Sequence, residues 1–115
     1  MNHAKSGKAI VTQSNKKMLP YRQMVSQTAA VTFRGRMAGK HVPVEMVVRF
    51  FLAKPPSAPK KREYPSVKPD IDKLERCILD ALTGIAYVDD GQVVGMDKKK
   101  LYGLPERTEI TVKAL

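Results

Sequence analysis

The sequence predicts an α+β fold in which two helices pack on a small mixed β-sheet, in a single domain over residues 1–115. Three observations predict it. The chain is 43% hydrophobic and 28% charged over 115 residues, which is typical of a protein with one core. Residues 42–53 alternate with the two-residue period of a strand. Residues 70–85 instead repeat apolar side chains with the period of a helix.

In the N-terminal half we expect a short strand over residues 9–12, a helix, and a second strand. The helix is expected from residue 16 to about residue 33, with Pro20 in its first turn. A basic loop with two glycines follows over residues 34–40. The strand over residues 42–53 is apolar on both faces, which indicates a central place in the sheet. The apolar face of the helix would consist of Leu19, Met24, Val25, Ala29 and Val31.

Residues 54–69 form a Pro/Lys-rich loop, with five prolines and five Lys or Arg side chains in sixteen residues. So many prolines fit neither a helix nor an inner strand. Long loops inside compact domains are usually functional or disordered. The cations favour a flexible arm that contacts DNA.

The C-terminal half predicts one helix followed by strands. Asp70 would cap a helix that runs to about Thr83, with Gly84 at its C-terminal end. A turn over residues 89–91 leads into one bent strand over residues 92–102, with Gly95 marking a bulge. A final strand covers residues 108–112. The buried stripe of the helix would be Leu74, Ile78, Ala81, Leu82 and Ile85.

The charge of the chain indicates a polyanionic partner. The net charge is +10, and residues 1–44 contain eight Lys or Arg and no Asp or Glu. Nucleic acid is the leading candidate, and a merely soluble basic surface is the alternative. Near the start of the first helix, Tyr21 and Arg22 either face DNA or form a packed tyrosine beside a solvated arginine.

Other classes of protein are disfavoured. The apolar runs are far shorter than a membrane span and no signal peptide opens the chain, so we expect no membrane partner. The single cysteine, Cys77, excludes an internal disulfide and a cysteine-based zinc site, and its apolar helical surroundings indicate a core residue. His3 and His41 lack a metal-ligand spacing.

Six of the eleven acidic residues lie within one short segment: Asp70, Asp72, Glu75, Asp80, Asp89 and Asp90. Taken singly, a helix cap, a first-turn acid and an Asp-Gly turn explain the aspartates. Taken together they do not, because one cap does not need Asp72 and two adjacent acids repel unless a cation stabilises them. Carboxylate oxygens are preferred ligands of Mg²⁺. The pattern therefore predicts a metal site that would act on phosphate.

Arg76 lies four residues after Asp72, on the same face of the predicted helix. This spacing fits a plain ion pair. It equally fits a cation that reaches a phosphate in the transition state.

Four runs of the sequence resemble the RusA-type Holliday junction resolvases, which are crossover junction endodeoxyribonucleases and often prophage-borne. The runs are residues 68–74, 80–82, 87–94 and 100–103, with weaker support from residues 16–25. The resemblance implies a homodimer that binds four-way or other branched DNA and cleaves it by paired nicks with Mg²⁺ or Mn²⁺. It also implies a role in DNA recombination and repair in a bacterial cytoplasm, from a bacterial or phage gene.

The resemblance assigns roles to particular residues. The essential acids of the family fall on Asp70, Asp72 and Asp90, the implied metal ligands. Arg76 occupies the position of the catalytic lysine. An arginine binds phosphate bidentately but does not readily give up a proton, so we expect it to stabilise charge. DNA contacts are expected from Lys16, Lys17, Arg22, Arg34, Arg36, Lys60, Lys61, Arg62, Lys68 and Lys73.

Two departures from the family pattern leave alternatives open. Lys73 stands where asparagine is usual, and the Gly/Pro-containing strand usual before Ile10 and Val11 is not evident. The first alternative is a catalytically weakened DNA-binding relative. The second is a basic RNA-binding protein, for which the cations suffice.

Overall fold

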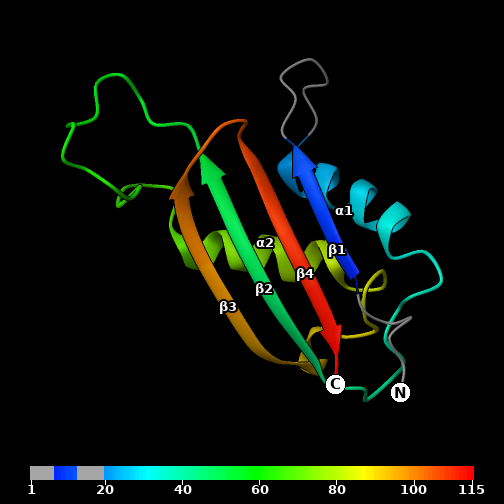
Figure 1. Ribbon diagram of the computed structural model, residues 1–115. Coiled ribbons are helices and arrows are strands. Elements are labelled where there is room, and N and C mark those ends of the chain that lie inside the picture. Colours follow the sequence, from blue (N-terminus) through cyan, green and yellow to red (C-terminus); the bar gives the residue numbers. More distant parts are fainter. Residues whose placement is uncertain (1–6, 13–19) are drawn as a thin grey trace.

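The computed structural model describes residues 7–12 and 20–115. Four strands form one sheet in the order β1-β4-β2-β3, in which β2 and β3 are parallel and the other neighbours are antiparallel (Figure 1). The predicted α+β fold with two helices and a mixed sheet is confirmed. The elements are β1 (Gly7–Thr12), α1 (Tyr21–Thr32), β2 (Val44–Leu52), α2 (Ile71–Leu82), the short 3-10 helix η2 (Asp90–Gln92), β3 (Val93–Tyr102) and β4 (Arg107–Ala114).

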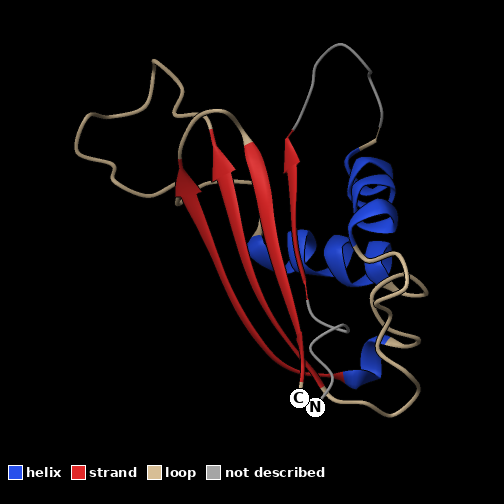
Figure 2. Cartoon of the chain, turned by 45° about the vertical axis from the view of Figure 1, so that its right-hand side comes forward, coloured by secondary structure: helices blue, strands red, loops and turns tan. Residues whose placement is uncertain are grey.

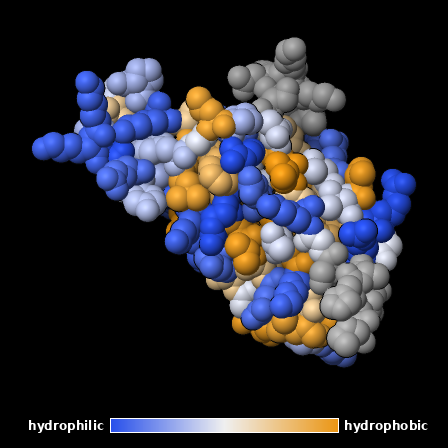
Figure 3. Space-filling model, viewed as in Figure 1, coloured by the Kyte–Doolittle hydropathy of each residue, from blue (hydrophilic) through white to orange (hydrophobic). Residues whose placement is uncertain are grey.

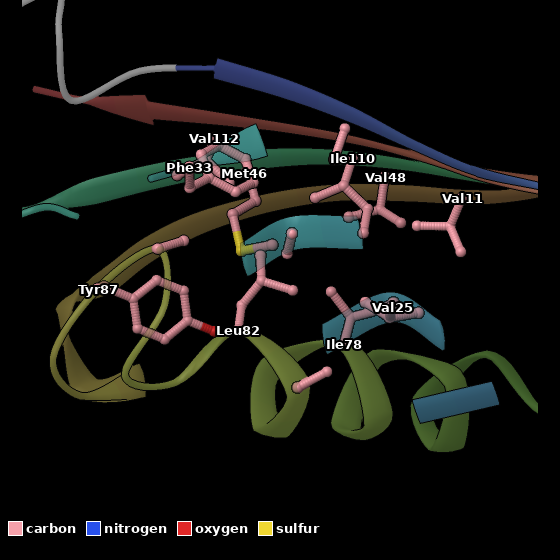
Figure 4. Packing of buried hydrophobic residues seen from close by; sticks show 14 of the residues in the cluster. Val11, Val25, Phe33, Met46, Val48, Ile78, Leu82, Tyr87, Ile110 and Val112 are labelled. Carbon is pink, nitrogen blue, oxygen red and sulfur yellow. The ribbon is translucent and has the colours of Figure 1, made fainter. Parts of the chain in front are cut away.

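Both helices cover the same face of the sheet, and the core lies between the two layers (Figure 2). Strand β2 lies between β4 and β3, so its predicted central place is confirmed. Every second residue of β2 from Val44 to Phe50 is buried, as the pleat of a strand requires. Figure 4 shows Val48 and Ile110 of the sheet above Ile78 and Leu82 of α2.

Helix α1 begins later than the sequence predicted. Tyr21 is its first residue, and Pro20 precedes it with an extended backbone (ψ 143°) instead of lying in the first turn. Residues 16–19 lie outside the described part of the chain. Val25 and Ala29 are buried as predicted, but Val31 is 69% exposed. Val31 follows Val25 by six positions, about 240° round the helix, and so points away from the core.

Helix α2 matches its prediction closely. Asp70 precedes it and Thr83 ends it, while Ile78, Ala81 and Leu82 are buried. Gly84 has a φ of +82°, the left-handed conformation that a glycine after a helix supplies. Leu74 and Ile85 pack against the same core from partly buried positions.

The connection between the parallel strands β2 and β3 carries the features on which function depends. A parallel pair needs a long crossover, because the chain must return to the starting end of the sheet. Here the crossover comprises residues 53–92, which include the Pro/Lys-rich loop, helix α2 and η2. The loop extends away from the end of β2 (Figure 1).

The bent strand predicted over residues 92–102 is confirmed as β3. Val44 pairs with Val93 and Glu45 pairs with Gly95, so Val94 is the extra residue of a bulge next to the predicted glycine. β4 is longer than predicted and occupies the position between β1 and β2. The Gly/Pro-containing strand that is usual in the family before Ile10 would precede β1, and that part of the chain lies outside the described residues.

Candidate functional site

Asp70 stands at the N-cap position of α2, but its carboxylate makes no capping hydrogen bond. Its Oδ2 instead lies 3.6 Å from Nζ of Lys68 and 3.8 Å from Nζ of Lys73. The capping role that explains an aspartate here therefore does not apply to this side chain. Its carboxylate faces solvent and two exposed lysines.

Asp72 lies in the first turn of α2, and its exposed carboxylate has no hydrogen-bond or ion-pair partner among the described residues. It lines a hollow of about 430 Å³ together with Lys73, Glu75 and Arg76. A second hollow, of about 390 Å³, lies between α2 and the start of β3 and also includes Glu75, Arg76 and Asp90. Glu75 and Arg76 line both hollows, so the two adjoin; together they are called the groove, with Asp72 in one hollow and Asp90 in the other.

Arg76 is the cation of this groove. Its Nη1 lies 3.2 Å from Oδ2 of Asp90 and 3.8 Å from Oδ1 of Asp80. Asp72, the partner that the helical spacing suggested, is not among its ion-pair partners in the described chain. The side chain of Arg76 is 64% exposed, so the guanidinium remains accessible to a ligand.

The two adjacent aspartates of the turn have different partners. The carboxylate of Asp89 accepts a hydrogen bond of 2.9 Å from the backbone N–H of Gly91 and caps η2. The carboxylate of Asp90 instead faces Arg76 across the groove. The Asp89 carboxylate thus stabilises the turn, whereas the Asp90 carboxylate belongs to the groove.

Gln92 holds this turn in place. Its Oε1 accepts from the backbone N–H groups of Val88 and Asp89, and its Nε2 donates to the carbonyls of Gly39 and Val42. The residue is only 8% exposed. Gln92 was not among the predicted site residues. The Asp-x-x-Gln spacing of a capping box was the signal that could have revealed it.

Three further residues, which connect β3 to the crossover, were also missed. Glu75 of α2 forms an ion pair with Lys98 of β3. Lys100, two residues along β3, donates hydrogen bonds to the backbone just before Asp70. The two-residue period of β3 places Lys98 and Lys100 on one face, but only the crossover shows that this face meets α2.

The Pro/Lys-rich loop, residues 54–69, is shaped by its own hydrogen bonds. Two turns close between Pro55 and Ala58 and between Pro59 and Arg62, each through a 3.0 Å backbone bond. Nζ of Lys54 crosses the loop to the carbonyls of Lys60 (3.3 Å) and Arg62 (2.8 Å). The side chains of Lys60 and Lys61 are displayed on a folded loop, not on a plain tether.

The predicted DNA-binding residues do not form one patch. Arg22 begins α1 beside Tyr21, whose neighbours include Pro69 at the base of the loop. Arg34 and Arg36 follow the other end of α1, next to Phe33, which packs beside Gly7 of β1. The helix between them is about 18 Å long at 1.5 Å per residue. The loop cations, Lys68, Lys73 and Arg22 therefore lie at one end of the molecule. Lys16 and Lys17 lie outside the described residues.

Tyr21 packs against the core, whereas Cys77 is half-buried and lies outside the cluster of buried hydrophobic residues, so its predicted place in the core is wrong. The Tyr21 hydroxyl bonds to Oγ1 of Thr108, and burial raises the pKa of Tyr21 to about 12. Tyr21 is thus packed, whereas Arg22 beside it is exposed and its guanidinium is accessible to a phosphate. Burial also raises the pKa of the Cys77 thiol, which disfavours the thiolate form that a nucleophile needs.

The carboxylates suit a hard divalent cation in donor type, but the structure does not gather them. Among the described residues no group of three or more His, Cys, Asp or Glu side chains is spaced to hold a metal ion. Asp70 faces two lysines and Asp90 faces Arg76. These exposed cations already neutralise the two carboxylates. A divalent ion would have to compete with them for the same oxygens.

A net charge of +10 on a small α+β protein is typical of the class of proteins that bind nucleic acid phosphates. None of the helices in the described part of the chain is long and apolar enough to cross a membrane. A model of the family described as Endodeoxyribonuclease RusA matches residues 2–113. The chain belongs to this family. The predicted resemblance is therefore confirmed, and it extends well beyond residues 68–103.

Two relatives place the chain more closely. The uncharacterized protein YqaN of Bacillus subtilis (strain 168) is 33% identical over 81 residues, which cover 62% of this chain and 57% of that protein. A protein of Lactococcus phage r1t, named crossover junction endodeoxyribonuclease rusA, is 34% identical over 76 residues, with 64% and 56% covered. The chain thus spans a little over half the length of the curated relatives it matches.

Proposed function

We propose that this protein is a divalent-metal-dependent endodeoxyribonuclease that cleaves four-way DNA junctions by paired nicks during recombination and repair. Membership of the RusA family and the name of the phage relative support this function. One structural observation carries it. The carboxylates of Asp70, Asp72 and Asp90 are free of the capping and turn-forming hydrogen bonds that would otherwise explain them among the described residues.

In this proposal Asp70, Asp72 and Asp90 would hold Mg²⁺ or Mn²⁺. A bound divalent ion makes water more acidic and neutralises the charge that develops on a phosphate. Arg76 would bind the scissile phosphate through its planar guanidinium, which presents paired N–H donors. Since arginine stays protonated, Arg76 stabilises charge and does not serve as the proton donor.

The cations at the loop end of the molecule would bind the DNA backbone around this groove. Lys60, Lys61 and Arg62 belong to the loop, Lys68 and Lys73 flank Asp70, and Arg22 lies at the loop base. Arg34 and Arg36, at the far end of α1, would contact a different segment of the junction. Lys16 and Lys17 remain expected contacts from the sequence alone.

Replacing Asp70 by asparagine separates the chemistry from the binding. Asparagine keeps the size of the side chain, and it caps helices about as well as aspartate. We expect Asp70→Asn to lose about 100-fold or more in cleavage of a labelled four-way junction with Mg²⁺, equivalent to about 2.7 kcal/mol or more of transition-state stabilisation. Asp72→Asn and Asp90→Asn should behave alike. Junction binding without metal should persist or tighten, because a negative charge is removed.

Asp89→Asn is the matched control, since an asparagine oxygen can still accept the bond from Gly91. We expect it to cleave within a few-fold of the wild type. Full cleavage by a folded Asp70→Asn protein would return these acids to structural roles. A wild type that binds the junction and never cleaves it would favour a weakened DNA-binding relative. Equal binding of RNA without a preference for four-way DNA would favour the RNA-binding alternative.

A further inference from the structure

Strand β3 carries three consecutive lysines with different surroundings. The register with β2 sets Lys98 beside Val48 and Lys100 beside Phe50, two residues buried on the helix-covered face. Lys99 pairs with Arg49 on the other face and is exposed. Because neighbouring residues paired across strands share a face, Lys98 and Lys100 point towards the crossover and Lys99 points away.

Lys100 reaches the segment that leads into α2. Its Nζ donates to the carbonyl of Val67 at 2.6 Å and to the carbonyl of Pro69 at 2.8 Å. These two carbonyls flank Lys68, and Pro69 is the residue directly before Asp70. Both bonds are charge-assisted and short, and such bonds are stronger than those between neutral groups.

Few other polar contacts hold the segment that leads into α2. Asp70 makes no capping hydrogen bond, and the sixteen residues before it contain no helix or strand. Within the described chain, the two bonds from Lys100 are the hydrogen bonds that tie residues 66–69 to the sheet. Ile71 and Leu74 pack α2 against the core, and the polar tether between β3 and the backbone before Asp70 is one ammonium group.

We infer that Lys100 is a positioning residue of the proposed site, because its ammonium fixes the chain before Asp70 against β3 and so sets where the Asp70 carboxylate stands. The importance of this for cleavage rests on the proposed function. Lys100 itself need not touch the DNA or the metal. A lysine suits this task because three donors on a long, flexible stem can serve two carbonyls at once.

The test replaces Lys100 by methionine, which keeps the unbranched side chain and loses the ammonium. Lys99→Met is the matched control, with the same charge change on the opposite face of the same strand. Amide hydrogen exchange is measured without metal or DNA at Ser66 and Leu74, whose N–H groups donate to the carbonyls of Tyr64 and Asp70 on either side of the tethered segment. We expect exchange there to be about tenfold faster in Lys100→Met than in Lys99→Met, with the amides of β2 unchanged. Lys100→Arg, which still donates to carbonyls, should recover part of the protection.

The second readout is the Mg²⁺ concentration that gives half the maximal single-turnover rate on a junction saturated with protein. We expect Lys100→Met to need several-fold more Mg²⁺, while its metal-free junction affinity equals that of Lys99→Met. If Lys100→Met does not fold, Lys100→Gln is the substitute, since it is polar but too short to reach both carbonyls.

Exchange and Mg²⁺ requirement equal to those of the Lys99→Met control would overturn the inference. So would a loss of junction affinity alone, because Lys100 would then be an ordinary phosphate contact. A wild type that does not cleave at all would defeat the proposed function, while the exchange measurement would still decide whether Lys100 holds the backbone at Asp70.

Discussion

At the scale of single residues, buried and half-buried polar groups explain the shape of the site better than the carboxylates do. Gln92 uses both of its amide hydrogens and accepts twice, so its four bonds link the turn of Asp89 to the loop that contains Gly39. The sequence showed that the acids are concentrated near residue 90. It did not show which of the two adjacent acids forms the turn, because that depends on where Gln92 is anchored.

Gln92→Glu should destabilise the protein strongly. A carboxylate cannot donate to the carbonyls of Gly39 and Val42, and it would face them in a buried place. We expect the free energy of unfolding to fall by about 2–4 kcal/mol at neutral pH, as for unsatisfied buried groups with an added charge. Urea denaturation measures the change. Gln27→Glu, the same change at an exposed position of α1, is the control, and equal stability of the two variants would contradict this account.

At the scale of elements, the Pro/Lys-rich loop was predicted as a flexible arm, and the structure shows it closed by bonds from Lys54. Proline content correctly indicated a loop. It did not indicate the hydrogen bonds from Lys54, because nothing in the sequence shows that a lysine just after a strand donates to carbonyls on the opposite side of the following loop. The start of α1 was misplaced for a related reason, since Pro20 is compatible both with a first turn and with the residue before it.

Changing Lys60, Lys61 and Arg62 to alanine should flatten the salt dependence of junction binding. If six phosphate contacts form, the logarithm of affinity should fall with the logarithm of salt with a slope of roughly −5, and removing one phosphate contact should make that slope shallower by about one. The measurement is a series of binding titrations at several salt concentrations without Mg²⁺.

A triple alanine variant of Lys40, Lys99 and Lys113 is the control for this series, since these lysines are exposed and lie outside the predicted contact set. It removes the same net charge. If both variants flatten the slope equally, the effect is one of overall charge and the loop is not a docking element.

At the scale of the whole molecule, the groove offers one set of carboxylates per chain, whereas an open four-way junction has two-fold symmetry. A two-fold dimer repeats every group about its axis and would supply both nicks. Strand β2 is paired on both edges, so only its helix-free face is open, whereas β3 lies at the edge of the sheet. The helix-free face mixes hydrophilic and hydrophobic side chains (Figure 3). Ile10 of β1 and Val47 of β2 are exposed hydrophobic residues of the sheet.

We therefore expect light scattering to give twice the chain mass of 12.8 kDa at micromolar concentration. The measurement is repeated with one junction bound, where two chains per junction are expected. A single chain in both conditions would exclude paired nicking by a preformed dimer. The sequence pattern does not indicate whether the helix-free face or the β3 edge would form the dimer interface. Alternation along a strand predicts which side chains are buried but not which surface covers them.

The position of β4 has a consequence for how the chain is made. β4 is the last strand along the described chain, yet it lies between β1 and β2 and pairs with both. Gly7 of β1 pairs with Val112, 105 positions later. During synthesis β1 must therefore wait until residue 112 has left the ribosome before its partner strand is complete. Until then Ala9 and Val11, both buried in the finished sheet, have no strand beside them, and their apolar side chains are exposed to aggregation.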